Sequence, residues 1–244
     1  MKIMTESEQK KYIYEEMQKI GFSLTDFQIQ QFYHYYAMLV ETNKVMNLTA
    51  ITEFEQVVEK HFVDSVIAPA ELFHVEQLRM IDVGTGAGFP GIPLKIMYPN
   101  LRITLLDSLN KRIRFLGQVV EQLCLENVTL IHGRAEDIAR DLQHREQYDL
   151  CVSRAVANLS TLSEYCLPFI KKQGLFVAYK SGSYQEELKQ AERSIRILGG
   201  KVEKTTEFSL PGSDLGRSMI WIRKEKNTQG KYPRKAGIPS KEPL

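Results

Sequence analysis

Long hydrophobic runs are absent from this chain of 244 residues. No apolar stretch approaches the roughly 18 residues of a membrane span, and residues 1–6 lack the apolar core of a secretory signal peptide. Cysteine is also scarce, since Cys124, Cys151 and Cys166 are odd in number and form no C-x-x-C pair. We therefore expect reduced thiols in a cytoplasmic protein, with no membrane segment, disulfide framework or metal site.

Negative charge is scarce near the C-terminus. Residues 223–244 contain seven Lys or Arg and two Glu, a net charge of +5, so the remainder sums to −3 because the whole chain carries +2. A basic tail on a mildly acidic body indicates contact with a polyanion, although a solvated, disordered end has the same composition. Tyr232 and the prolines around it favour an extended tail with an aromatic ring available for base stacking.

Three glycines at alternate positions, Gly84, Gly86 and Gly88, follow a short apolar strand predicted at residues 78–83. Glycine has no Cβ, so such a loop can adopt positive φ angles and let a ligand touch its backbone. Two prolines shortly after the loop suit the first turn of a helix. The order strand, glycine loop, helix is typical of a nucleotide-binding unit, whose ligand lies at the carboxyl ends of the strands.

The spacing of the glycines separates two classes of cofactor. The dinucleotide pattern G-x-G-x-x-G/A needs Gly or Ala at position 89, where this chain has Phe89. The spacing G-x-G-x-G after Asp82 instead resembles the first motif of class I S-adenosylmethionine (AdoMet) methyltransferases. A turn that only packs a strand against a helix would also use glycine, but the downstream pattern agrees with a cofactor site.

Strands and helices alternate from residue 78 onward. Helices are predicted at residues 110–123, 158–168 and 184–197, and further strands at residues 102–106, 128–132, 149–153, 175–179, 201–209 and 217–223. Such alternation implies a parallel sheet covered on both faces. No helix separates the last two strands, so this pair should be antiparallel.

These elements predict an α/β protein of the class I AdoMet-dependent methyltransferase fold. Its Rossmann-like sheet is seven-stranded and mostly parallel, with an antiparallel last strand. An N-terminal helical extension is expected at residues 1–70, the methyltransferase core at 71–224 and the basic C-terminal tail at 225–244. Hydrophobic residues make up 43% of the chain and charged residues 25%, as in soluble globular proteins.

Three helices are predicted in the N-terminal extension, at residues 6–20, 25–42 and 53–68. Thr25 can cap the second helix, and Thr52 with Glu55 matches a capping box for the third. The second helix carries four aromatic residues that could stack on bases. A stripe at this spacing more often packs in a core; its members are Phe32, Tyr33, Tyr35 and Tyr36.

His61, Asp64 and Ser65 share one face of the third helix because they lie at positions i, i+3 and i+4. The three residue types invite a hydrolase interpretation. One helical turn cannot easily arrange nucleophile, base and orienting group in order, however, and the chain has no G-x-S-x-G elbow. A polar helix face near the mouth of the site explains the set better, and its role stays open.

Each candidate site residue follows the carboxyl end of a predicted strand. Asp107 lies 23 positions after Gly84, near the offset of the acidic residue that accepts hydrogen bonds from ribose hydroxyls; a helix cap is the alternative. Ala135 and Glu136 could read the adenine edge with a backbone N–H and a carboxylate. A Glu in the first turn of a helix is also favoured by the helix dipole.

Arg154 follows the fourth predicted strand, beside the point where methyl transfer should occur. A guanidinium group there could bind the carboxylate of the cofactor or a substrate phosphate through two parallel hydrogen bonds. An ordinary surface arginine is the alternative. Arg154 is therefore the candidate catalytic residue as well as a cofactor ligand.

Several segments together carry a more specific resemblance. They are Asn47-Leu48-Thr49, His61-Phe-Val-Asp64-Ser65, Asp82-Val-Gly-Thr-Gly-Ala-Gly-Phe-Pro-Gly91, Leu106-Asp107-Ser108, Ser153-Arg154-Ala155 and Tyr232-Pro-Arg-Lys-Ala-Gly237. The set resembles the RsmG (GidB) family of bacterial ribosomal RNA small-subunit methyltransferases G, and the match spans nearly the whole chain. The Gly-Phe-Pro-Gly continuation is far more specific than the glycine loop alone.

The resemblance implies AdoMet-dependent methylation of N7 of one guanine in 16S rRNA, in a decoding-region loop, with the small ribosomal subunit as partner. It also implies cofactor contacts at Gly84, Phe89, Ala135, Glu136 and Arg154. Together with strand position and the motifs above, the predicted cofactor-binding set is Gly84, Gly86, Gly88, Phe89, Asp107, Ser108, Ala135, Glu136 and Arg154. We expect a monomer, although the sequence does not determine the oligomeric state.

The chemistry of guanine N7 is consistent with this set. N7 carries a free lone pair in the major groove, so it needs no deprotonation, and catalysis can rest on in-line positioning. Exocyclic-amine methyltransferases carry an (Asp/Asn/Ser)-Pro-Pro-aromatic turn where this chain has residues 153–156, Ser-Arg-Ala-Val. Enzymes that methylate C5 of cytosine use a cysteine beside proline, whereas Cys151 follows Leu150 within a strand.

Two other functions are compatible with the sequence. One is a methyltransferase that acts on a small molecule or a protein, which the basic tail disfavours. The other is a non-catalytic RNA-binding module with a relic cofactor fold, which the intact glycines, Asp107 and Glu136 disfavour.

Overall fold

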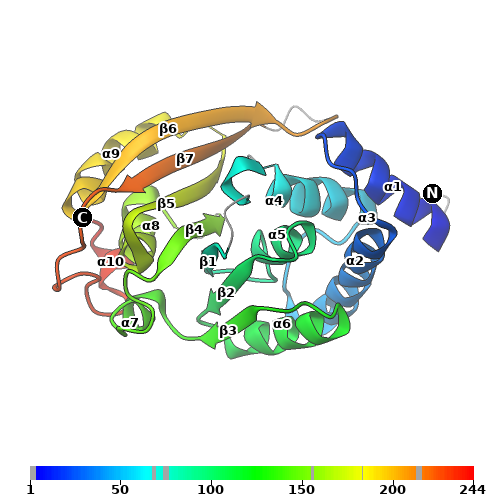
Figure 1. The fold of residues 1–244 in the computed structure, drawn as a ribbon, viewed down its shortest axis with the longest axis horizontal. Helices are drawn as coiled ribbons and strands as arrows, with labels where there is room; N and C mark the ends of the chain where they lie inside the picture. The colour runs from blue at the N-terminus through cyan, green and yellow to red at the C-terminus, as the bar shows by residue number, and fades with distance from the viewer. Residues whose placement is uncertain (1–3, 68–69, 74–76, 155–156, 183, 213–215) are drawn as a thin grey trace.

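The computed structural model describes residues 4–67, 70–73, 77–154, 157–182, 184–212 and 216–244. Its centre is a seven-stranded sheet in the order β3-β2-β1-β4-β5-β7-β6 (Figure 1). Strands β1 to β5 pair in parallel, and β7 runs antiparallel to both β5 and β6. The predicted fold class is therefore confirmed. The strands are β1 (Arg79–Val83), β2 (Arg102–Asp107), β3 (Val128–His132), β4 (Tyr148–Arg154), β5 (Ile170–Ser181), β6 (Gly200–Ser209) and β7 (Gly216–Lys224).

Strand β5 begins five residues earlier than the sequence predicted. Ile170 already pairs with Tyr148, and the register then shifts so that Leu150 pairs with Leu175. The intervening residues, Lys-Lys-Gln-Gly, are polar and end in glycine, which is typical of a turn. The regular part of the strand matches the prediction, and the irregular start follows from tertiary pairing with β4.

Helices cover both faces of the sheet. The longer ones agree with the predicted ranges to within a few residues, and Gly199, with φ 86°, follows the end of α9. The α-helices are α1 (Glu6–Lys19), α2 (Asp26–Met46), α3 (Phe54–Val57), α4 (Asp64–Val66), α5 (Gly91–Met97), α6 (Asn110–Gln122), α7 (Ala135–Ile138), α8 (Leu159–Cys166), α9 (Gln185–Ile197) and α10 (Ile238–Lys241). Short 3-10 turns occupy Ala70–Phe73 and Leu167–Phe169.

The helix predicted at residues 53–68 is divided by a π-helical turn, Val58–Val63, between α3 and α4. The capping box predicted for Thr52 and Glu55 is wrong. Glu53 is the N-cap residue and no side chain caps the helix, so Thr52 lies one position too early to close the box. Thr25, in contrast, forms the expected cap of α2, together with Gln28.

Alternate residues of the central strands contribute to two separate hydrophobic cores. Met80 and Leu105 face a core built with α1, α2, α5 and α6, whereas Ile81 and Leu106 face a core built with α8 and α9. The N-terminal helices therefore share one core with the sheet. In the aromatic stripe of α2, Phe32 and Tyr35 are fully buried, and the two tyrosines Tyr33 and Tyr36 pack against the same core.

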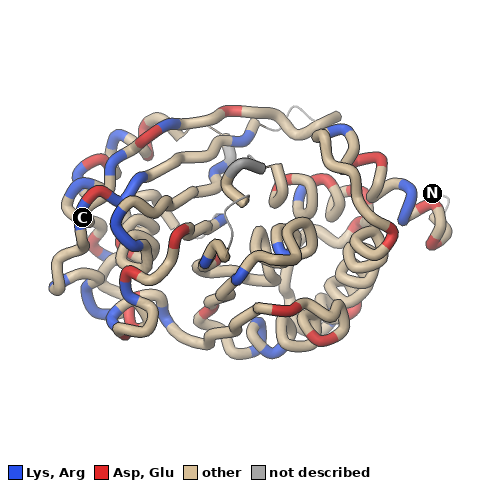
Figure 2. Tube along the Cα trace, in the orientation of Figure 1, with Lys and Arg blue, Asp and Glu red and all other residues tan. Residues whose placement is uncertain are grey.

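The basic C-terminal segment is folded against the body, so the expectation of an extended tail is wrong. Tyr232 is buried within the core of α8 and α9 and is not available for base stacking. Helix α10 lies against α8 (Figure 1). Lys and Arg positions gather around this end of the chain, interleaved with a few acidic ones (Figure 2). Within the described residues, no helix is long and apolar enough to span a membrane.

Candidate functional site

A hollow of about 220 Å³ lies at the carboxyl ends of β1, β2 and β3. Five of the predicted cofactor-binding residues line it. They are Gly84, Asp107, Ser108, Ala135 and Glu136, and they are joined by Val83, Leu106, Gly133, Arg134 and Tyr165. The residues meet because parallel neighbouring strands end at one edge of the sheet, as the sequence predicted. We call this space the first hollow.

The glycine loop forms one wall of the first hollow. Gly84, Gly86 and Gly88 have φ angles of 72°, 62° and 106°, which favour glycine. A Cβ on Gly86 would meet no atom within 4 Å, whereas a Cβ on Gly88 would lie 2.7 Å from the Tyr35 hydroxyl. That hydroxyl donates a 2.6 Å hydrogen bond to the Ala87 carbonyl. Helix α2 therefore supports the loop at Ala87 and Gly88, while the space beside Gly86 is open to a ligand.

Two buried carboxylates hold the loop in place. Asp82 Oδ2 accepts hydrogen bonds from the Thr85 hydroxyl (2.7 Å) and from Gly91 N–H (2.9 Å). Within the described residues, Asp82 Oδ1 has no hydrogen-bond partner. Burial raises the pKa of the Asp82 carboxyl to about 7, against the lowering effect of these two donors. Asp82 therefore lies beneath the loop and shapes it.

Asp107 supports the loop from the second strand. Its Oδ2 accepts from Gly86 N–H (2.9 Å) and from the Arg112 guanidinium (3.2 Å), and its Oδ1 accepts from Leu109 N–H (2.8 Å). The N-cap of α6 is Leu109, so Asp107 does not cap the helix. A carboxylate has about four acceptor sites, which leaves capacity for a further donor in the hollow.

Glu136 forms the opposite wall, at the start of α7. It is 4% exposed, and its Oε1 accepts a 2.8 Å hydrogen bond from the backbone N–H of Gly237. This contact joins residues 101 positions apart in the chain. A segment that the sequence assigned to RNA contact therefore touches a predicted adenine-reading residue.

A second hollow, of about 280 Å³, opens over the ends of β4, β5 and β7. Four basic residues line it: Lys60, Arg154, Lys180 and Arg217. The strand order reverses direction between β1 and β4, so the two hollows lie on either side of the topological switch point, where open α/β sheets bind their ligands. His61, Asp64, Tyr179 and Phe208 complete much of the lining.

Arg154 is held by the helix that carries His61 and Asp64. Its guanidinium donates to Asp64 Oδ2 (3.3 Å) and to the Lys60 carbonyl (3.3 Å), and its Nη2 lies 3.2 Å from His61 Nδ1. Burial lowers the pKa of Arg154, and the nearby Asp64 carboxylate opposes this. Asp64 Oδ1 also accepts from Arg217 Nε at 3.0 Å. The arginine is thus a fixed cation with one face turned to the second hollow.

His61 is neutral at ordinary pH. Burial, and then the Arg154 charge, lower its pKa to about 3. Its Nδ1 lies 3.2 Å from the Arg154 guanidinium, which can only donate, and 3.1 Å from the Lys60 carbonyl, which can only accept, and its Nε2 lies 2.8 Å from the Thr49 hydroxyl. Ser65 Oγ donates to the His61 carbonyl. His61, Asp64 and Ser65 form no nucleophile–base pair, as the sequence argument expected; Asp64 and His61 contact Arg154, whereas Ser65 contacts the backbone of its own helix.

Phe89 lines neither hollow. Its ring is 6% exposed and stacks against His61 with ring centroids 4.5 Å apart. The Arg154 guanidinium lies over the same ring at 5.0 Å, a cation–π geometry. Phe89 therefore connects the glycine loop to the arginine that borders the second hollow.

Sequence reasoning missed two residues of the site. Arg217 opens β7, and because β7 is antiparallel, its first residues lie at the edge where β4 and β5 end. The predicted antiparallel strand at 217–223 could have identified it. Tyr165 reaches the first hollow from α8, and no local pattern distinguishes it from a core tyrosine.

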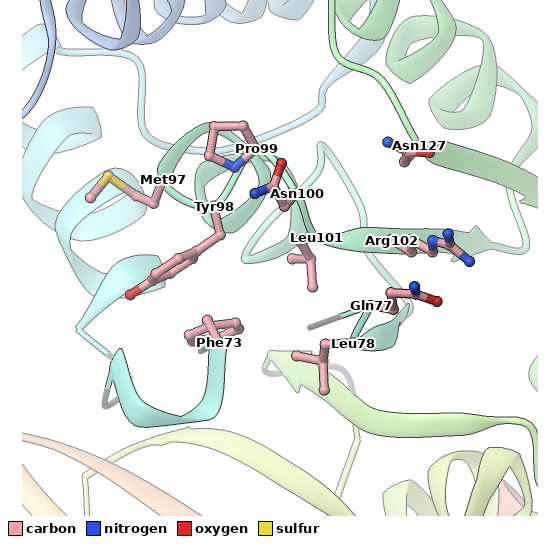
Figure 3. A pocket seen from close by; sticks show the side chains of 10 residues that line it. All are labelled: Phe73, Gln77, Leu78, Met97, Tyr98, Pro99, Asn100, Leu101, Arg102 and Asn127. Atoms are coloured by element: carbon pink, nitrogen blue, oxygen red, sulfur yellow. The ribbon is translucent and has the colours of Figure 1, made fainter. Parts of the chain in front are cut away.

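A larger hollow, of about 620 Å³, lies elsewhere. Its lining includes Leu78 and Arg102, at the amino ends of β1 and β2, together with Phe73 and Tyr98 (Figure 3). This edge of the sheet is opposite to the glycine loop. Within the described residues, no group of three or more His, Cys, Asp or Glu could hold a metal ion there or elsewhere. Size alone therefore does not locate the site.

Comparison with known sequences gives one consistent family. Residues 28–215 match the family model described as "GidB: rRNA small subunit methyltransferase G". A protein of Alkaliphilus metalliredigens named "Ribosomal RNA small subunit methyltransferase G" is 50% identical over 237 residues, covering 97% of this chain and 99% of that protein. A protein of the same name from Lachnoclostridium phytofermentans is also 50% identical, covering 93% of this chain and 94% of its own.

Solved structures with a similar fold have far lower identity. M. jannaschii TYW2 in complex with AdoMet is 14% identical with a TM-score of 0.54, covering 72% of this chain and 79% of that chain. The [4+2]-cyclase SpnF has the same identity and TM-score, covering 81% of this chain and 96% of that chain. These similarities show the fold alone, because both identities are low and one of the two proteins is a cyclase.

Proposed function

The chain belongs to the rRNA small subunit methyltransferase G family, and from this premise we propose that it transfers a methyl group from AdoMet to N7 of a guanine in 16S rRNA. The match of residues 28–215 to the family model shows that the chain belongs to this family, as do relatives about 50% identical over nearly the whole chain. A ribosomal RNA substrate would place the reaction in the cytoplasm, with the small ribosomal subunit as partner. Methyl transfer needs an electrophilic methyl group, which the sulfonium of AdoMet supplies when bound.

The residues of the first hollow fit the adenosine part of AdoMet. Asp107 retains acceptor capacity for ribose hydroxyls, and Glu136 retains its second oxygen for the adenine edge. The open space beside Gly86 lets a ligand approach the loop backbone. Gly84, Ser108 and Ala135 border the same space. The amino-acid end would then run along the glycine loop toward β4.

Arg154 and the second hollow fit the acceptor RNA. Four cationic side chains from different elements line the hollow. The negative charges near them are Asp64, which also lines it, and Glu187, which pairs with Lys180 at 2.6 Å. An excess of positive over negative charge attracts a phosphate backbone. We assign Arg154 the role of orienting either a phosphate of the target nucleotide or the carboxylate of the cofactor. Its fixation by Asp64 and His61 allows it to do so with little reorganisation.

The acceptor nitrogen needs no base in this arrangement. N7 of guanine carries its lone pair in the neutral base, so the protein has only to align the nitrogen with the methyl group and its leaving sulfur. His61, the candidate base that lines the second hollow, is neutral, but both of its ring nitrogens already have partners within the protein: Arg154 and the Lys60 carbonyl at Nδ1, and the Thr49 hydroxyl at Nε2.

Modification mapping tests the proposal. Mass analysis of 16S rRNA, isolated with and without this protein, should differ by one methyl group on one guanine, and purified small subunits should regain it with AdoMet and the protein. Methylation of a protein or small molecule, with rRNA unchanged, would instead support the first alternative function. Absence of AdoMet binding in calorimetry would support the non-catalytic RNA-binding module.

A further inference from the structure

The C-terminal segment packs behind the wall of the first hollow, against residues of α7 and α8 that line it or neighbour its lining. Gly237 N–H donates to Glu136, and Thr161 on α8 donates from its hydroxyl to the Pro239 carbonyl at 2.8 Å. Arg140, which follows α7, donates to the Pro233 carbonyl at 2.6 Å. The segment thus ties together α7 and α8, which carry Glu136 and Tyr165 into the hollow.

Arg234 anchors the segment. Its Nε and Nη2 donate to the Glu164 carboxylate at 3.0 and 2.7 Å, and its backbone N–H donates to the same carboxylate at 2.7 Å. The Glu164 side chain is fully buried. A forked arginine–carboxylate pair of this kind is strong and directional. Glu164 immediately precedes Tyr165, so this anchor lies next to a residue of the first hollow.

We propose that Arg234 and residues 236–244 position Glu136 and Tyr165 for the adenosine end of the cofactor, so that the C-terminal segment sets cofactor affinity. This inference rests on the proposed function and concerns the same site. Arg234 touches no reacting group and acts through Glu164, and Gly237 acts through Glu136. If the segment acts in this way, its loss should weaken cofactor binding and leave the rate at saturating cofactor nearly unchanged.

A chain that ends after Lys235 keeps the Arg234–Glu164 pair and loses the Gly237 and Pro239 contacts, together with the Glu242 carbonyl that accepts from Arg234 Nη2 at 2.7 Å. We expect its dissociation constant for S-adenosylhomocysteine, measured by calorimetry, to rise roughly tenfold, equivalent to about 1.4 kcal/mol. KM for AdoMet should rise in parallel, while kcat should change less than about twofold. Lys241→Gln is the matched control for the lost lysine: its cofactor affinity should equal that of the full chain, and any change in its KM for RNA should equal that of the shortened chain.

Arg234→Lys provides a second variant that keeps the charge and loses the fork. Its cofactor affinity should fall between those of the full chain and the shortened chain. Circular dichroism checks that both variants are folded. Unchanged cofactor affinity in both folded variants would overturn the inference, and so would a fall in kcat without a change in affinity. If the full chain itself does not bind S-adenosylhomocysteine, the proposed function fails; if it binds and the variants bind equally well, only this inference fails.

Discussion

At the scale of single residues, the site is organised by carboxylates that hold neighbouring elements together and also line the two hollows. Asp107 is the clearest case, because it holds Gly86 and Leu109 through their backbone N–H groups and also lines the first hollow. Asp64 similarly bridges Arg154 and Arg217. A substitution at either position therefore removes a site group and a structural acceptor together.

Asp107→Ala should weaken AdoMet binding by roughly 1.5–3 kcal/mol, the range for a lost hydrogen bond to a charged acceptor. The variant should also lose some stability, because two backbone donors lose their partner. Titration calorimetry of the folded variant measures the first effect and urea unfolding the second. Unchanged affinity in a folded variant would exclude Asp107 from the cofactor site.

The pH dependence of the chemical step tests the absence of a base. Single-turnover rates at saturating substrates should stay nearly constant from about pH 7.5 to 9. The His61 pKa of about 3 keeps that ring neutral throughout this interval, and the Asp82 pKa of about 7 lies below it. Burial lowers the pKa of Lys224 to about 8, within the interval, but Lys224 lines neither hollow. A tenfold rise per pH unit within the interval would indicate a general base and contradict the mechanism. Below pH 7, protonation of Asp82 would weaken its hold on the loop, so a decline there is compatible with it.

At the scale of elements, the glycine loop is shaped by the helices beneath it. Tyr35 of α2 donates to the loop, and Ile92 of α5 and Leu116 of α6 close the space under Gly88. Helix α2 of the N-terminal extension therefore supports the glycine loop directly, and it shares a hydrophobic core with the sheet.

Gly88→Ala and Gly86→Ala form a matched pair that tests this support. Both substitutions place a side chain at positive φ, which costs roughly 1–2 kcal/mol. Only the Gly88 methyl group would also meet Ile92, Tyr35 and Leu116 at 2.7–2.8 Å, which adds roughly 1–3 kcal/mol of overpacking. Urea unfolding should show a larger loss for Gly88→Ala, whereas Gly86→Ala should mainly reduce AdoMet affinity. Equal losses of stability would mean that the helices do not brace the loop.

At the scale of the whole molecule, charge is unevenly divided between a basic C-terminal segment and a mildly acidic body. The inner side of this segment contacts α7 and α8, and its outer side carries the exposed residues Lys231, Lys235 and Lys241. One segment can therefore contact RNA on one side and support the cofactor site on the other.

Replacing Lys231, Lys235 and Lys241 together with Gln should weaken RNA binding and flatten its salt dependence. Each lost phosphate contact should lower the slope of log affinity against log salt by roughly 0.7–0.9 units. Cofactor affinity should stay unchanged, because the three side chains are exposed and the contacts to Glu136, Thr161 and Glu164 remain. An unchanged salt slope in filter binding would show that the RNA lies elsewhere, with the second hollow as the next candidate surface.

The sequence by itself determined the features that depend on neighbouring residues. Periodicity located the strands, and their alternation with helices implied the parallel sheet. From that sheet it followed that Gly84, Asp107, Ala135 and Glu136 would meet, because parallel strands end at one edge. The special spacing of the glycine loop indicated the class of cofactor, since only small residues suit its backbone angles.

Only the tertiary structure decided which residues, distant in the chain, satisfy each other's hydrogen-bonding groups and charges. Arg154 is held by Asp64, 90 positions away, and Glu136 by Gly237, 101 positions away. Tyr232 is buried although its neighbours in the chain are polar and basic. Local composition predicts that such a segment is exposed to solvent, because the residues that form its hydrogen bonds and ion pairs lie far away in the sequence. The buried carboxylate of Glu164 needs a cation, and the folded chain brings Arg234 to it.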